Sequence, residues 1–248
     1  MSTEAIQNAP AAFPAGTNLT PEQFLQSALS LRPRIAVFDC DGTLWSGDAG
    51  RDFFFWEIEQ GLIPDEVLRW VKPRYADYKA GKVDEATMCG EMVTIHAGLS
   101  ESDLESAAER FFEENVEPNI FPIMRELTRR LAESGCELWA VSSTNEWVVR
   151  AGTRRFGIPD NHVIAACVHI ENSCATDRLL RVPTDEAKAT AIREVIAREV
   201  DAVFGNSMHD AAMLSIAANA FAINPNPDLG QLARERGWSI YFPEPAQR

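Results

Sequence analysis

The 248-residue sequence lacks several features that would each mark a class of protein. It has no apolar run of about 18 residues, so we expect no transmembrane helix and no membrane partner. Its five cysteines include no Cys-x-x-Cys pair and its four histidines no His-x-x-x-His pair, which disfavours a zinc site. An odd number of cysteines in a chain of this length favours reduced thiols, and we therefore predict a cytoplasmic protein.

Positive charge is also scarce. The sequence has 23 basic and 37 acidic residues, which gives a formal net charge of −14. Such a surface repels polyanions, so nucleic acid is not an expected partner. A small anionic substrate is compatible with this charge, because a single site can be locally positive on an acidic protein.

Hydrophobic residues make up 46% of the chain and charged residues 24%, the balance of a globular protein. At about 150 residues per domain, the length predicts one or two domains. We expect an N-terminal arm at residues 1–30 and a core domain formed by residues 31–46 and 120–248. Residues 47–119 show helical patterns and no convincing strand, which predicts an all-helical insertion.

The core domain shows strands that alternate with helices. Short apolar runs predict strands at 34–38, 137–141, 162–170, 201–204, 220–223 and 239–242, with a hairpin partner at 179–182. Apolar side chains at three- and four-residue intervals predict helices between them. This order implies an α/β fold with a Rossmann-like parallel sheet and helices on both faces. Ligands of such sheets bind outside the carboxyl ends of the strands.

A pair of carboxylates follows the first predicted strand. Asp39 and Asp41 are separated by one residue, and Gly42 and Thr43 come directly after them. One carboxylate of such a pair can attack an electrophile while the other moves a proton, and a glycine lets the backbone turn. Taken alone, the motif is equally typical of a capped turn, because Asp and Gly are common turn residues.

Three further polar features lie at strand ends or helix starts. They are Ser142 with Ser143, Lys188, and Asn206 with Asp210. Each has an ordinary structural alternative: a hydroxyl or an acid can cap a helix, and a helical lysine is usually solvated. Together they would bring a hydroxyl, an ammonium and oxygen ligands for a hard cation to one edge of the sheet.

In this order, the features resemble the four motifs of the haloacid dehalogenase-like superfamily. These motifs are Asp-x-Asp-x-(Thr/Val), a Ser or Thr after a hydrophobic strand, a Lys, and an acidic cluster Gly-Asp-x-x-x-Asp. They match residues 39–43, Ser142, Lys188 and residues 205–210. The insertion resembles the C1 cap of the family, and its length is similar to that of the phosphoserine phosphatase-like branch.

The resemblance implies a phosphatase mechanism. Asp39 would attack phosphorus and form an aspartyl-phosphate, and Asp41 would protonate the leaving oxygen and then activate water. Ser142 and Lys188 would hold the phosphoryl oxygens. The remaining candidates for phosphate or substrate binding are Gly42, Thr43, Ser143 and Asp48.

The resemblance also implies Mg²⁺, with Asp39, Asp41, Asn206 and Asp210 as candidate ligands. The fourth motif of the family usually begins Gly-Asp, whereas this sequence has Gly205 and Asn206. An amide oxygen can bind Mg²⁺ but brings no negative charge, so we expect weaker metal affinity and not a lost site.

We therefore predict a Mg²⁺-dependent phosphatase, monomer or homodimer, that acts on a small phosphorylated metabolite. The resemblance to phosphoserine phosphatases implies a cap Arg that binds the substrate carboxylate, but the corresponding residues 86–93 contain no Arg, which puts phosphoserine in doubt as the substrate. Arg51, Arg74 and Lys79 are cap cations that could take its place. Two alternatives stay open. One is transfer of the phosphoryl group to an alcohol through the same intermediate, and the other is a catalytically silent binder of phosphorylated ligands, which Asn206 would favour.

Overall fold

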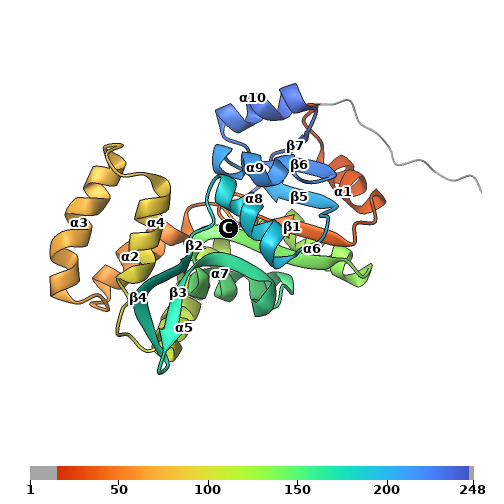
Figure 1. The fold of residues 1–248 in the computed structure, drawn as a ribbon. Helices are drawn as coiled ribbons and strands as arrows, with labels where there is room; N and C mark the ends of the chain where they lie inside the picture. Colours follow the sequence, from red (N-terminus) through yellow and green to blue (C-terminus); the bar gives the residue numbers. More distant parts are fainter. Residues whose placement is uncertain (1–15, 246–248) are drawn as a thin grey trace, which may run out of the picture.

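One seven-stranded sheet organises the residues that the structure describes, which are 16–245 in a computed structural model (Figure 1). Its strands are β1 (Ile35–Phe38), β2 (Glu137–Asn145), β3 (Val163–Glu171), β4 (Cys174–Arg181), β5 (Ala202–Gly205), β6 (Asn219–Ile223) and β7 (Ser239–Tyr241). The strand order is β4-β3-β2-β1-β5-β6-β7, and every neighbouring pair is parallel except β3 and β4. The predicted α/β class with a parallel core is confirmed.

Helices cover both faces of the sheet. One face carries α8 (Glu186–Val195), α9 (Ala211–Ser215) and α10 (Pro227–Arg236), and the other carries α1 (Pro21–Ser30), α6 (Pro122–Glu133) and α7 (Glu146–Thr153). Successive side chains of a strand point to opposite faces. In β1, Ile35 and Val37 accordingly pack with α8, α9 and α10, whereas Ala36 and Phe38 pack on the opposite side. A central strand that is apolar at every position is typical of a sheet buried on both faces.

Residues 47–119, which we call the cap, contain helices and no strand. The helices are α2 (Ala49–Glu59), α3 (Asp65–Lys79), α4 (Glu85–Thr94) and α5 (Glu101–Phe111), followed by a π-helical turn (Phe112–Val116) and a 3₁₀ turn (Glu117–Asn119). Figure 1 shows α2, α3 and α4 standing beside the sheet, whereas α5 lies against α7. Phe54, Val71 and Met88 belong to a small apolar core of the cap itself. The boundaries of arm, core and cap stay predictions.

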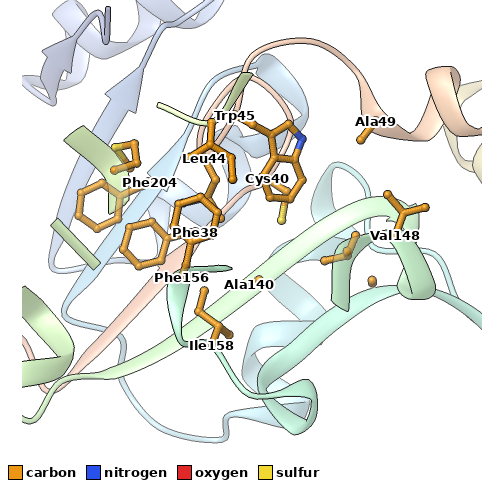
Figure 2. Close-up of a cluster of buried hydrophobic side chains, with 14 of the residues drawn as sticks. Phe38, Cys40, Leu44, Trp45, Ala49, Ala140, Val148, Phe156, Ile158 and Phe204 are labelled. Carbon is orange, nitrogen blue, oxygen red and sulfur yellow. The ribbon is translucent and has the colours of Figure 1, made fainter. Parts of the chain in front are cut away.

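The turn after β1 is fixed by a buried apolar cluster (Figure 2). Cys40, Leu44 and Trp45 are fully buried in it, and Phe38 stacks on Phe204 of β5 with ring centroids 4.5 Å apart. Because these side chains hold the backbone on both sides of residues 39–43, the polar groups between them have little freedom to move.

Three elements differ from the expectation. β2 continues to Asn145, so residues 142–144 lie within the strand and not after it. The hairpin partner predicted at 179–182 is only the end of β4, which already begins at Cys174. Helix α10 was not predicted, because only its narrow buried face around Leu229 and Ala233 is apolar. Of the predicted N-terminal arm, residues 1–15 lie outside the described range.

Candidate active site

The carboxyl ends of β1, β2 and β5 meet at a cavity of about 250 Å³ between the sheet and the cap. The predicted residues that line it are Asp39, Asp41, Asp48, Ser142, Ser143, Lys188 and Asn206. Gly42, Thr43 and Asp210 contact members of this group from behind the cavity wall. The structure therefore brings together residues that are up to about 170 positions apart in the sequence, as expected for strand ends of one parallel sheet.

Lys188 joins two carboxylates at the floor of the cavity. Its Nζ donates to Asp39 Oδ1 at 2.7 Å and to Asp210 Oδ1 at 2.5 Å. The Lys188 side chain is only 3% exposed, so both of its acidic partners compensate a charge that is removed from water. Asp39 Oδ2 accepts a hydrogen bond from the Thr43 hydroxyl at 2.9 Å, which fixes the second oxygen of the carboxylate.

The shared ammonium sets the electrostatics of this group. Burial and the neighbouring Asp210 raise the pKa of Asp39 to about 7, although Lys188 acts in the opposite direction. Burial lowers the pKa of Lys188, but the two carboxylates raise it by more, so the side chain stays charged. The single ammonium of Lys188 thus neutralises only one of the two carboxylates that it contacts. Further positive charge at this edge would favour the ionised, nucleophilic form of Asp39.

Asp41 is held by three donors. Its Oδ1 accepts from Trp45 Nε1 and from the Ala49 amide, both at 2.7 Å, and its Oδ2 accepts from the Thr144 hydroxyl at 2.8 Å. Burial and then Asp48 raise the pKa of Asp41 to about 6, against the lowering effect of these hydrogen bonds. A carboxyl group that titrates near neutral pH can both give and take a proton at physiological pH.

Gly42 and Thr43 shape the turn. Their amides donate to Trp45 O at 2.7 Å and to Cys40 O at 3.1 Å, so both amides are bonded inside the turn. The role of Gly42 and Thr43 in phosphate binding stays a prediction. Gly42 has φ +74°, and a Cβ there would lie 1.9 Å from Asn206 Nδ2. Only glycine therefore lets the Asn206 side chain approach the backbone beside Asp41.

Asp210 lies behind the cavity. Its Oδ2 accepts from the amides of Asn206 and Ser207 at 2.9 and 3.0 Å, while Oδ1 accepts from Lys188. A Cβ on Gly205 would lie 2.7 Å from Asp210 Cβ, so the strand end and the acid are in close contact. Asp210 is fully buried and does not line the cavity, and its contacts hold Lys188 and the amides of Asn206 and Ser207 in place. Its role as a metal ligand stays a prediction.

Two serines from β2 line the cavity. Ser142 Oγ accepts from the Thr144 amide at 3.2 Å, and within residues 16–245 its own proton has no acceptor. Asn145 caps α7 by accepting from the Val148 amide at 3.0 Å. The Ser142 hydroxyl is therefore not needed as a helix cap and can bind a ligand, with Ser143 beside it in the cavity wall.

The cap supplies the other half of the cavity. Asp48 is the N-cap of α2, and its carboxylate accepts from the Arg51 amide at 2.8 Å. The remaining cap side chains in the wall include Phe54, Glu57, Tyr75, Tyr78, Glu85, Met88 and Cys89. Tyr75, Tyr78 and Met88 carry no signal for a cavity wall in the sequence, because aromatic and apolar residues at helical spacing are more often core residues.

The oxygen atoms at this edge fit a hard divalent cation. Within the described residues no group of three or more His, Cys, Asp or Glu is arranged to hold a metal. The available ligands are the Asp39 carboxylate, the Asp41 backbone carbonyl and the amide oxygen of Asn206, whose side chain lines the cavity. Mg²⁺ keeps several waters and needs few protein ligands, so this oxygen set suits it and does not suit zinc.

The chain belongs to the family of haloacid dehalogenase-like hydrolases, whose family model matches residues 36–215. It is 25% identical over 217 residues to "Histidinol-phosphatase" of Neisseria meningitidis serogroup C, covering 83% of this chain and 97% of that protein. It is 27% identical over 222 residues to "Phosphoserine phosphatase SerB1" of Mycobacterium tuberculosis, covering 83% and 69%. The predicted class, a haloacid dehalogenase-like hydrolase similar to phosphatases, is confirmed.

Solved structures show the same fold. A protein of unknown function from Bordetella pertussis Tohama I aligns with a TM-score of 0.72 at 23% identity and covers 84% of this chain and 97% of its own. A phosphoserine phosphatase solved as a phospho-aspartyl intermediate analogue aligns with a TM-score of 0.56 at 17% identity, covering 86% and 94%. In the part of the chain at 16–245, no helix has the length and apolar character needed to cross a bilayer.

Proposed function

We propose that this protein is a Mg²⁺-dependent phosphatase that hydrolyses a small phosphomonoester through an aspartyl-phosphate on Asp39. One observation carries the proposal: the Asp39 carboxylate lies at the floor of a cavity, bonded to a buried Lys188, with the Asp41 carboxyl group in the same wall. This arrangement offers a nucleophile, a cation for phosphoryl oxygens and a proton carrier around one small volume.

In the first step, an Asp39 oxygen attacks phosphorus and the bond from phosphorus to the substrate oxygen breaks. The electron pair of that bond goes to the leaving oxygen, which takes a proton from the Asp41 carboxyl group. The raised pKa of Asp41, about 6, makes this proton available near neutral pH. The products of the step are the free alcohol and phosphorylated Asp39.

In the second step, the Asp41 carboxylate takes a proton from a water molecule as that water attacks phosphorus. The bond from phosphorus to Asp39 then breaks, which releases inorganic phosphate and restores both carboxyl groups. Asp41 is held by Trp45 and Thr144 throughout, so the same oxygen atoms face the cavity in both steps.

Charge on the transferring phosphoryl group needs nearby donors. Lys188 and the Ser142 hydroxyl are two donors of the core domain that line the cavity together with Asp39. Mg²⁺, held by Asp39, the Asp41 carbonyl and Asn206, would supply positive charge that offsets the charge of the substrate. Asp210 keeps Lys188 and the loop at 205–210 in place and does not touch the substrate.

The size of the cavity and its cover by the cap indicate a small substrate. The names of two relatives provide candidates, which are histidinol phosphate and O-phosphoserine. Both belong in a panel of phosphorylated metabolites. A panel with and without an added alcohol also separates hydrolysis from phosphoryl transfer, because transfer would give a new phosphate ester in place of inorganic phosphate.

The decisive test is hydrolysis of p-nitrophenyl phosphate with Mg²⁺ and with EDTA. We expect turnover that needs Mg²⁺ and that falls by about 10³-fold or more in Asp39→Asn, since the nucleophile is lost. Asp228→Asn makes the same chemical change at an exposed position in the first turn of α10 and should keep wild-type activity. A wild-type protein that binds phosphate esters but turns over none of the panel would contradict the proposal and support a silent binder.

A further inference from the structure

The cap half of the cavity has an excess of negative charge. Asp48 and Glu85 both line it, and within residues 16–245 no cationic side chain comes within 4.0 Å of either carboxylate. Glu57 also lines the cavity, but it is paired with His96 at 2.7 Å. Burial and then the Glu85 carboxylate raise the pKa of Tyr78. Burial also raises the pKa of Asp48, with smaller contributions in the same direction from Asp52 and Glu85 and opposing ones from Arg51.

The one cap cation in the cavity wall has a different partner. Arg51 binds Asp52 through Nε at 2.8 Å and through a second guanidinium nitrogen at 2.7 Å, with both side chains about half exposed. Arg74, on α3, binds Glu91 and does not line the cavity. Helix α4, which contributes Glu85, Met88 and Cys89 to the cavity wall, contains neither Arg nor Lys. A substrate carboxylate would therefore meet acids here, and the cation in the wall, Arg51, is already paired with Asp52.

Glu85 is oriented for a ligand. Its Oε2 accepts the Tyr78 hydroxyl and its Oε1 accepts the Cys89 thiol at 3.6 Å. Each carboxylate oxygen has two acceptor sites, so Glu85 keeps acceptor capacity toward the cavity after these bonds form. These two contacts restrain the carboxylate, which reduces the entropy lost when a donor binds to it.

Aromatic rings stand next to this carboxylate. Tyr75 lies between Phe54 and Tyr78, with ring centroids 5.4 and 5.9 Å apart, and all three rings line the cavity. The face of such a ring attracts an ammonium or another organic cation within about 6 Å of its centre. Rings and carboxylates in one wall are complementary to a positively charged nitrogen and repel a carboxylate.

We propose that the cap half of this cavity selects phosphomonoesters whose organic part carries a cationic nitrogen and no carboxylate, with Glu85 as the main specificity-determining residue. The phosphate would lie against Lys188 and Ser142, and the cation against Glu85 and the tyrosine rings. This inference rests on the proposed phosphatase function and extends it to the chemical class of the substrate.

The test compares four phosphate esters of similar size. O-Phosphoethanolamine carries an ammonium, ethyl phosphate is uncharged beyond the phosphate, phosphoglycolate carries a carboxylate, and O-phosphoserine carries both groups. We expect kcat/KM to be highest for O-phosphoethanolamine, by about tenfold over ethyl phosphate, the value of one partly desolvated ammonium contact. The kcat/KM for O-phosphoserine should be lower than that for O-phosphoethanolamine, and the kcat/KM for phosphoglycolate should be lower than that for ethyl phosphate.

Glu85→Gln removes the charge and keeps the shape. It should lower kcat/KM for O-phosphoethanolamine by about tenfold, mainly through KM, and change that for ethyl phosphate by less than about twofold. Glu91→Gln is the matched control, because Glu91 lies on the same helix, outside the cavity, and should leave all four values unchanged. Retained hydrolysis of ethyl phosphate shows in the same assay that each variant is folded.

Two results would overturn the inference while leaving the phosphatase proposal intact. One is a wild-type preference for O-phosphoserine that Arg51→Gln abolishes, since Arg51 would then bind the carboxylate. The other is an equal loss for ethyl phosphate and O-phosphoethanolamine in Glu85→Gln, which would make Glu85 a structural residue. Failure of all esters, including p-nitrophenyl phosphate, would instead refute the phosphatase proposal itself.

Discussion

At the scale of single residues, Asn206 sets the charge of the proposed metal site. It brings an amide oxygen where the family motif usually has a carboxylate. Because added ligand charge strengthens the binding of a hard cation, Asn206→Asp should lower the Mg²⁺ concentration for half-maximal hydrolysis of p-nitrophenyl phosphate by about tenfold. A Mg²⁺ titration of initial rates measures this value.

Asn224→Asp is the control for that titration, since it adds the same charge at an exposed position after β6 and outside the cavity. It should leave the half-maximal concentration unchanged. An unchanged value in Asn206→Asp as well would show that residue 206 is not a ligand.

The sequence was sufficient to place Asp39, Ser142 and Lys188 at one edge of the sheet, because strand ends and helix starts can be read from local pattern. It was not sufficient for the groups that hold Asp41. Trp45 and Thr144 are 4 and 103 positions away from it, and their contacts depend on how the turn after β1 packs. A tryptophan after a glycine turn gives no local signal that its indole nitrogen will bind a carboxylate.

At the scale of elements, a buried ion pair within the cap lies against the core domain. Glu57 of α2 and His96, which follows α4, are 1% and 0% exposed and lie 2.7 Å apart. The His96 ring also packs edge-on against Trp147 of α7, with centroids 5.2 Å apart. Burial lowers the pKa of His96, but Glu57 raises it by more, so the pKa lies above its ordinary value of 6.5.

This raised pKa makes stability depend on pH with a definite sign. Below pH 6.5 the imidazole is protonated in both folded and unfolded chains, and its contribution to the free energy of unfolding is complete. As the pH rises through the raised pKa, the folded chain loses that proton and the contribution disappears. We therefore expect the thermal midpoint of the wild type to fall above pH 6.5, and His96→Gln to lack this part of the fall.

Calorimetry or circular dichroism at a series of pH values, in buffer without Mg²⁺, measures both midpoints. Burial gives Asp39 and Asp41 pKa values of about 7 and about 6, but both proteins share these groups. The difference curve therefore reports the pair of His96 and Glu57, since burial also raises the pKa of Glu57 and His96 lowers it. His169→Gln, at a half-buried position in β3, should reproduce the wild-type curve. If the thermal midpoints of wild type and His96→Gln changed with pH in parallel, the raised pKa of His96 would not be the cause of the fall.

The elements themselves could be predicted where their pattern was strong. The buried strands around Val37 and Val203 are short apolar runs between polar turns, and the structure has strands at both. The end of β2 was harder, because Ser142 and Thr144 are polar and the strand continues through them only by pairing with β3. Tertiary pairing decided that boundary, and local sequence could not.

At the scale of the whole molecule, cap and core share one apolar cluster. Phe53 and Leu104 of the cap pack in the same cluster as Trp147 and Phe38 of the core domain. The sequence predicts a helical insertion, but not how it docks, because docking depends on contacts between residues far apart in the chain. The net charge of the molecule, by contrast, follows directly from its composition.

That charge, −14, should oppose the approach of a phosphate dianion. Raising NaCl from about 0.01 M to about 0.15 M shortens the screening length from about 30 Å to about 8 Å, so we expect kcat/KM for ethyl phosphate to rise by about twofold. O-Phosphoethanolamine has a lower net charge at the same phosphate group and should gain less. Potassium chloride in place of NaCl, at constant free Mg²⁺, separates screening from an effect of sodium. A flat or falling profile for ethyl phosphate would mean that local positive charge at the cavity outweighs the field of the whole protein.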